Sequence, residues 1–359
     1  MRNPLALFLA ALFILLAGCV APGPERTPDA KRQLLWPRPP DQPRFVFEGL
    51  LRSAADILVE TDEMRVQRML TGRRISDKPV IDKPAGIAVR GGLVYVAEPS
   101  AKAITVFDLQ RRRLFRFGLR KPNSLERPQA IAVDTAGLVY VLDSALRKVM
   151  VFDDLGLFKY AIDLGRSFTH PVAVAVNPDG SLIYVVDRGD VGNADHKVVA
   201  YTPDGSERYR IGSRGEEAGQ FNIPLAAAVG TDGTLYVADA GNFRIQAFDR
   251  RGQYRFSFGG PGLETGRFSR PRGIALDGEG NIYVSDAGFN NVQIFDADGR
   301  LLMPLGRLSS EAGPGNYSLI AGIAVDETNR LYIVDHFFKK IDVFRRLGDE
   351  EARRLATTP

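Results

Sequence analysis

The sequence predicts an all-β fold: a six-bladed β-propeller of four-stranded antiparallel blades, whose ring is closed by an N-terminal strand in the last blade. The main observation is a phrase of Tyr, Val or Ile, one further residue and an acid, which occurs six times and begins at Tyr95, Tyr140, Tyr184, Tyr236, Tyr283 and Tyr332. Successive tyrosines are 45, 44, 52, 47 and 49 residues apart. A recurrent period of this length is the signature of a repeat architecture.

Each repeat carries the short β-type runs of one propeller blade. In the fourth repeat these runs are Leu225–Val229, Thr234–Ala238, Arg244–Phe248 and Tyr254–Phe258. Asp232-Gly233 stands between the first two runs, and such pairs accept the positive φ of tight hairpins. The same pattern places the six blades at about 83–118, 127–165, 170–212, 223–260, 270–306 and 319–348.

The predicted propeller, residues 44–348, has an extra strand at its N-terminal end and a missing strand at its C-terminal end. The sixth repeat ends after Lys340–Phe344 without a fourth strand, whereas the run 44–51 alternates in polarity and belongs to no repeat. We therefore expect residues 44–51 to form the outer strand of the last blade, because this closure removes exposed sheet edges. A short helix is predicted at about 62–70, and residues 349–359 form an acidic and then basic tail.

The N-terminal residues have the features of an export signal. A basic start precedes the apolar run Leu5–Ala17, which at thirteen residues is shorter than the roughly 20 that cross a membrane. The sequence Leu16-Ala17-Gly18-Cys19 resembles the lipobox of bacterial lipoproteins, and Cys19 is the only cysteine. The resemblance implies a signal peptide at 1–18 and a lipid on Cys19. Because Val20 follows, it also implies an outer-membrane lipoprotein of the cell envelope, in either the periplasmic or the surface-facing leaflet.

Residues 19–43 are predicted to be the lipidated cysteine and a Pro-rich tether. The only tryptophan, Trp36, stands here within Trp36-Pro37-Arg38-Pro39-Pro40. A Pro-rich run with an aromatic residue is either a docking peptide or a strap that lies against the domain it precedes. We expect the strap.

Composition excludes several classes of protein. Hydrophobic residues make up 45% and charged residues 25%, which excludes a disordered or fibrous chain. One Cys and three His exclude an internal disulfide and a cysteine-based zinc site. The 47 basic and 43 acidic side chains give a net charge of +4, which by itself indicates no partner. We expect no nucleic-acid partner, because an exported chain leaves the cytoplasm, and membrane contact through the lipid anchor only.

The repeats resemble NHL repeats. The fifth repeat shows the pattern in Pro271–Leu276, Tyr283–Asp286 and Val292–Asp296. The resemblance extends over about 83–348 and implies the propeller fold, but no single function, because propellers host enzymes, RNA binders and docking platforms. Some NHL-like propellers are lyases that hold zinc through histidines directly after the Pro that opens an inner strand. Here those positions are Ala85, Gln129, Val172, Leu225, Arg272 and Ala321.

The repeated acids and tyrosines have a structural interpretation, because they recur in every repeat. We expect each carboxylate to accept hydrogen bonds from the following loop and each tyrosine to pack between blades. The third repeat breaks the pattern with a loop five residues longer, which offers Asp190, Asn193, Asp195 and His196 as candidate ligands of a cation such as Ca²⁺. A longer surface loop without an ion is the alternative, and no cofactor is expected beyond this candidate Ca²⁺ or Zn²⁺ site.

Basic residues gather where the inner strands are predicted to begin. Lys83, Arg127, His170, Arg270 and Arg272 form a candidate rim for an anion or a partner, because Arg binds planar anions with two donors. Neighbouring loops add Arg120, Lys121, Arg166, Arg214 and Arg267. The alternative is that nearby acids neutralise this rim: Glu126, Glu216, Glu217 and Glu264.

These observations favour a membrane-anchored interaction scaffold that docks an envelope or secreted protein on the propeller face. No catalytic residue is assigned, because Gly-x-Ser-x-Gly, P-loop and dinucleotide-binding motifs are all absent from the sequence. Two alternatives stay open. One is a metal-dependent lyase or lactonase-like hydrolase in the channel, which needs groups such as His170, His336 or Asp190. The other is a sensor of small anionic ligands that uses the rim.

Overall fold

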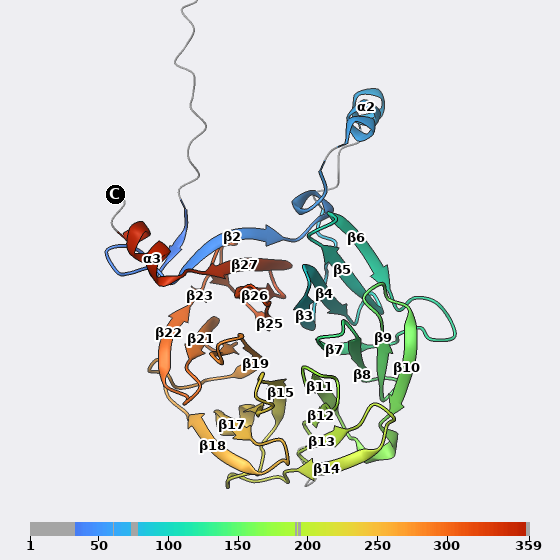
Figure 1. Cartoon of the computed structure of the whole chain (residues 1–359), viewed down its shortest axis with the longest axis vertical. Coiled ribbons are helices and arrows are strands. Elements are labelled where there is room, and N and C mark those ends of the chain that lie inside the picture. The colour runs from blue at the N-terminus through green and yellow to red at the C-terminus, as the bar shows by residue number, and fades with distance from the viewer. Residues whose placement is uncertain (1–32, 60, 73–77, 191, 193–194, 357–359) are drawn as a thin grey trace, which may run out of the picture. The chain divides into compact units, whose positions relative to one another are not determined.

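The computed structural model describes residues 33–59, 61–72, 78–190, 192 and 195–356. The chain divides into two compact units, Met1–Leu34 and Leu35–Pro359. The predicted signal peptide, Cys19 and most of the predicted tether lie outside the described residues. In the second unit, six sheets surround a central channel, as predicted (Figure 1).

Each of the first five blades is an antiparallel meander that runs from the channel outward. Blades 1 and 2 are β3 (Gly86–Arg90), β4 (Leu93–Glu98), β5 (Ala103–Asp108), β6 (Arg113–Phe117), then β7 (Pro128–Val133), β8 (Val139–Asp143), β9 (Lys148–Phe152), β10 (Phe158–Asp163). Blades 3 and 4 are β11 (Pro171–Val176), β12 (Ile183–Asp187), β13 (Lys197–Tyr201), β14 (Glu207–Ile211), then β15 (Pro224–Val229), β16 (Leu235–Asp239), β17 (Arg244–Phe248), β18 (Tyr254–Gly259). Blade 5 is β19 (Pro271–Leu276), β20 (Ile282–Asp286), β21 (Asn291–Phe295), β22 (Leu301–Leu305).

The second strand of each blade is covered by neighbouring blades on both faces. Every residue is buried in β4, β8, β12, β16 and β20. An outer strand such as β22 instead alternates between partly buried and exposed residues. A strand buried on both faces needs a nearly continuous apolar run, which is why the Tyr-Val phrases are apolar before their terminal acid except at Ser285, whose hydroxyl accepts the Gly273 N–H.

The repeated tyrosines pack between blades, as predicted. Tyr283 of blade 5 lies in one apolar cluster with Ile333 and Phe344 of blade 6. Three of the tyrosine hydroxyls also donate to an acid in the turn that follows the inner strand, at 3.0 Å each: Tyr140 to Asp134, Tyr283 to Asp277 and Tyr332 to Asp326. The tyrosines therefore join the blades together.

Burial raises the pKa of all six repeated tyrosines above the ordinary value. An unfolded tyrosine loses its proton near pH ~10, whereas a buried one keeps it, so above this pH the folded state binds more protons. Stability present below about pH 10 should therefore fall as the pH rises, by about 1.4 kcal/mol per pH unit for each tyrosine. Urea unfolding at a series of alkaline pH values measures this. A free energy of unfolding that stays constant there would contradict it.

Blade 6 joins the two ends of the unit. Its strands are β25 (Ile320–Val325), β26 (Arg330–Asp335), β27 (Lys340–Arg346) and β2 (Phe45–Leu51). β2 pairs antiparallel with β27, with Phe47 opposite Phe344 and a register shift between Phe47 and Gly49. The long ribbon of β2 lies along β27 in Figure 1. The predicted closing strand at 44–51 is thus confirmed.

The segment around Trp36 lies on the propeller. β1 (Leu35–Trp36) pairs with β2 and adds a fifth strand to the last sheet. The Trp36 ring packs edge-on against Phe344, with 5.5 Å between ring centroids. This is the strap arrangement, and it means that the predicted tether 19–43 includes residues from Leu35 onward that belong to the propeller unit.

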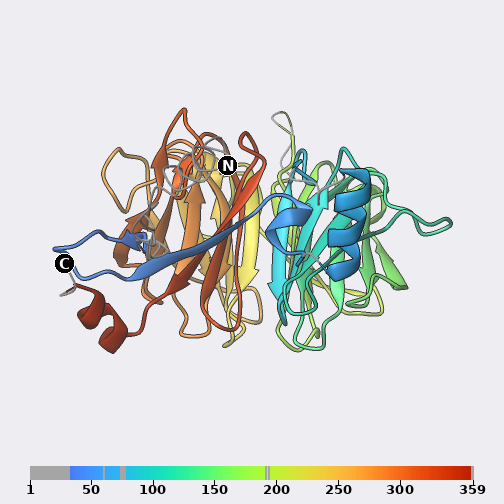
Figure 2. The same cartoon turned by 90° about the horizontal axis from the view of Figure 1, so that it is seen from above.

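Two helices flank the ring (Figures 1 and 2). α2 (Asp62–Thr71) forms where a short helix was predicted, with Thr61 accepting from the Met64 backbone N–H at its start. α3 (Asp349–Ala356) forms where only a tail was expected. Its acidic first turn and basic last turn suit the helix dipole, and Arg345 bonds to Glu351 at 2.9 and 3.0 Å.

Short elements complete the fold: η1 (Ala54–Asp56), η2 (Gly165–Ser167), η3 (Ala240–Asn242), β23 (Arg307–Leu308) and β24 (Asn316–Tyr317). Among the described residues, no helix combines the length and the apolar character needed to span a membrane.

Candidate functional site

The inner strands of all six blades begin at the same end of the channel, which we call the channel mouth. The repeated acid of each blade fixes the backbone there. Asp143 accepts the N–H groups of Glu126 and Arg127 at 2.6 and 2.9 Å, and those of Ala145 and Leu146 in the following loop. Equivalent bonds join Asp187 to Thr169 and His170, Asp286 to Ser269 and Arg270, and Asp335 to Ser318 and Leu319. The predicted structural role of the acids is confirmed, and it extends to the loop before each inner strand.

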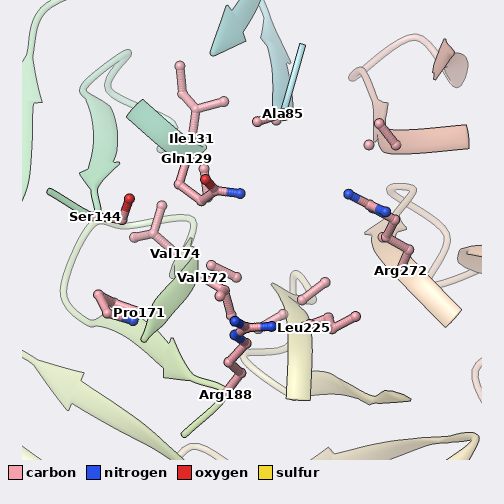
Figure 3. Close-up of a pocket in the computed structure, with 18 of the residues that line it drawn as sticks. Ala85, Gln129, Ile131, Ser144, Pro171, Val172, Val174, Arg188, Leu225 and Arg272 are labelled. Carbon is pink, nitrogen blue, oxygen red and sulfur yellow. The ribbon is translucent and has the colours of Figure 1, made fainter. Parts of the chain in front are cut away.

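A cavity of about 550 Å³ occupies the channel at this end. All six positions that follow the start of an inner strand line it: Ala85, Gln129, Val172, Leu225, Arg272 and Ala321 (Figure 3). The next residue of each strand is small: Gly86, Ala130, Ala173, Ala226, Gly273 and Gly322. A Cβ on Gly86 would lie 3.1 Å from the Ala130 Cα, so small residues here let neighbouring inner strands approach closely.

The charged side chains that line the cavity are all cationic. Arg127, Arg188 and Arg272 line it. The described residues that line the cavity include no Asp or Glu. Arg188 and Arg272 point into the same space from different blades, and the Gln129 amide points there too (Figure 3). Within the described residues, none of the three guanidinium groups has a side-chain hydrogen bond or ion pair. By contrast, Arg244 near the mouth pairs with Asp239 at 2.9 Å.

The surroundings of Arg272 shift its pKa. Its side chain is open to water, yet it is enclosed by protein because it projects into the channel rather than out from the surface. Burial by the channel wall, together with the charge of Arg270, lowers the pKa of Arg272 below its ordinary value. The guanidinium stays protonated at neutral pH. An anion placed in the channel would therefore relieve an unfavourable interaction.

The three histidines differ in their locations and contacts. His170 lines the cavity, and its Nδ1 lies 3.1 Å from the Gly189 carbonyl oxygen. His336 is not among the lining residues. His196 is buried and its Nδ1 accepts the Ile223 N–H at 3.0 Å, so it joins the inserted loop of blade 3 to blade 4.

The candidate cation ligands do not come together as a set. The carboxylate of Asp195 lies 3.8 Å from Lys197, and His196 Nε2 lies 3.4 Å from the backbone oxygen of Asp190. Asn193 lies outside the described residues. Across the described ranges, no three His, Cys, Asp or Glu side chains are close enough together to hold a metal ion.

The predicted basic rim separates into two sets. Arg127, His170 and Arg272 line the channel cavity. Lys83 and Arg270 are exposed and do not line it. Glu126, one of the acids expected to neutralise the rim, binds Lys102 at 2.5 Å. The sequence therefore placed these basic residues at one end of the propeller but could not say which of their side chains turn inward.

Arg188 and Ser144 line the cavity and were not proposed from the sequence. Both follow directly the acid of a Tyr-Val phrase, as do Pro99, Ala240, Ala287 and His336 in the other blades. A comparison of this position across the six repeats would have drawn attention to Arg188, the only arginine there.

Comparison with known proteins supports the repeat assignment. The NHL repeat model matches residues 221–248 and 268–295, in blades 4 and 5. Rat peptidylglycine alpha-amidating monooxygenase is 32% identical over 136 residues, which is 34% of this chain and 13% of that protein. Human NHL repeat-containing protein 3 is 35% identical over 83 residues, 23% of each chain. The chain thus spans less than a quarter of the length of either relative.

A solved structure gives the same fold. A gluconolactonase from Xanthomonas campestris superposes with a TM-score of 0.55, at 18% identity, over 74% of this chain and 87% of that one. At this identity the likeness shows the fold alone. Six blades, a closing N-terminal strand and two matching repeats lead to one conclusion: the chain is a six-bladed β-propeller whose fourth and fifth blades contain NHL repeats.

Proposed function

We propose that the protein is a lipid-anchored docking module of the cell envelope, whose channel mouth binds an envelope or secreted protein. The lipobox-like sequence that ends at Cys19 supports anchorage in the outer membrane. Mass spectrometry of the purified protein tests the anchor. We expect a mature chain that begins with acylated Cys19.

The observation that carries the proposal is the positive charge exposed around the channel mouth. Exposed basic side chains without an ion pair within the described residues surround the channel mouth outside the cavity: Lys83, Arg120, Arg166 and Arg270. Complementary charge directs a partner to one surface and speeds its encounter. An acidic protein surface would therefore dock at the mouth.

A charge-reversal series tests the docking proposal. The triple variant Arg120→Glu, Arg166→Glu and Arg270→Glu changes exposed side chains around the mouth. We expect it to reduce recovery of a stoichiometric partner from solubilised envelopes by about tenfold or more, because a repulsive face replaces an attractive one.

The matched control is Arg112→Glu, Arg208→Glu and Arg251→Glu, which changes the same charge at exposed sites away from the mouth. The control should keep the partner, and both triple variants should melt near the parent temperature. Equal recovery of the partner by the mouth variant and the parent protein would refute docking at this face.

A further inference from the structure

The wall of the channel cavity has a cationic and polar part and an aliphatic part. The guanidinium groups of Arg188 and Arg272 and the Gln129 amide project into the cavity, and Arg127 also lines it. Ser144, Thr169 and His170 add polar groups to the wall. Aliphatic side chains form most of the remainder: first Ala85, Val172, Leu225 and Ala321, then, two residues further along the inner strands, Ile87, Ile131, Val174, Ile274 and Ile323. Such a wall is matched by a ligand with one anionic group and one apolar part.

The cationic groups are not required by the repeat. The position of Arg272 holds alanine, glutamine, valine or leucine in the other five blades, and all six blades form the same sheet. Arg188 likewise stands where other blades have Pro, Ser, Ala or His. Neither guanidinium bonds to any group of the described chain. Their structural contribution is therefore small, and their placement needs another explanation.

The arginines are held on a rigid framework. The Asp143 carboxylate fixes the backbone of Arg127, and the Arg188 N–H donates to the His170 carbonyl oxygen at 3.2 Å. Arg272 is the second residue of β19, whose neighbouring Gly273 N–H donates to Ser285 Oγ at 2.9 Å. These bonds fix the backbone from which each arginine projects, so a ligand has to order only the arginine side chains when it binds.

We propose that the channel binds a small amphipathic carboxylate, with its carboxylate between Arg272 and Arg188 and its apolar part against the Val172 and Leu225 side of the wall. A planar carboxylate accepts two parallel hydrogen bonds from a guanidinium. The enclosed cavity strengthens this attraction relative to open water, and the aliphatic wall removes the apolar part of the ligand from water. The site lies inside the mouth and is distinct from the rim surface proposed to dock a protein.

Calorimetry on the full-length protein in detergent tests the proposal with three probes. Hexanoate carries both features, phosphate carries only the charge, and hexanol carries only the apolar chain. Hexanoate should bind most tightly of the three. Arg272→Gln should weaken hexanoate at least tenfold, and Arg188→Gln with Arg272→Gln about a hundredfold, because each charge-assisted hydrogen-bonding pair contributes on the order of one to two factors of ten.

Arg120→Gln is the matched control, because it removes an exposed arginine at the same end but outside the cavity, and it should bind hexanoate as the parent does. Three results would overturn the proposal: no binding of hexanoate, equal binding by the parent and the double variant, or tighter binding of phosphate or hexanol. Partner recovery is not part of this readout. A failure of docking therefore leaves this result standing, and a failure here leaves docking standing.

Discussion

A chain that begins at residue 53, and so lacks β1 and β2, should not form a stable monomeric ring. β2 covers β27 along its whole length and buries Phe45, Val46 and Leu51. Each of these side chains contributes about 2 kcal/mol on burial, and the total approaches the 5–15 kcal/mol that separates typical folded and unfolded states. The exposed edge of β27 would also offer a template for pairing with other chains.

Size-exclusion chromatography and thermal unfolding measure this effect. We expect the shortened chain to associate or to lose its cooperative transition. A chain that begins at residue 33 keeps both strands and serves as the control, with an unchanged melting temperature. A monomeric, cooperatively folding chain from residue 53 would show that the ring does not depend on the N-terminal strand.

Replacing Asp143 by Ala should destabilise the protein by about 3 kcal/mol and displace Arg127 at the channel mouth. The carboxylate is fully buried and accepts four backbone N–H groups, two from the loop before β7 and two from the loop after β8. Without it, buried donors lose their partners, and each lost partner costs about 1–3 kcal/mol, with relaxation of the loops lowering the sum.

Asp143→Asn is the informative companion variant. Its amide oxygen can still accept from one loop, so we expect it to lose about half as much stability as Asp143→Ala. Urea unfolding gives both values. If Asp143→Ala unfolds at the same urea concentration as the parent, the acid does not hold the loops of the mouth.

The fold could be predicted from the sequence because each structural feature of a propeller produces a local sequence pattern. The Tyr-Val phrases mark the buried second strands. The run 44–51 could be assigned to the last blade because the sixth repeat has only three predicted strands and this run belongs to no repeat. Even the channel-lining positions followed from the register of the repeats, since Gln129 and Arg272 occupy the same place in their strands.

Other features depend on three-dimensional packing and could not be predicted in this way. Both Arg270 and Arg272 flank the start of β19, but only Arg272 turns into the cavity. Arg188 occupies a repeated position after the acid of its blade, but the sequence alone does not say that its side chain turns into the channel. α3 has too few apolar residues to show a pattern, and only its Ala352 is buried.

The central claim is that the channel mouth, rather than the opposite end, is the working surface of the propeller. A photoreactive amino acid placed at Ser269 or at Gly278 tests it directly in intact cells, because the two exposed positions lie at opposite ends of β19. A Cβ at Gly278 would meet no atom within 4 Å, so we expect a side chain there to be accommodated. We predict a specific protein adduct from position 269 and none from position 278. An adduct from position 278 alone, or equal adducts from both, would contradict the account.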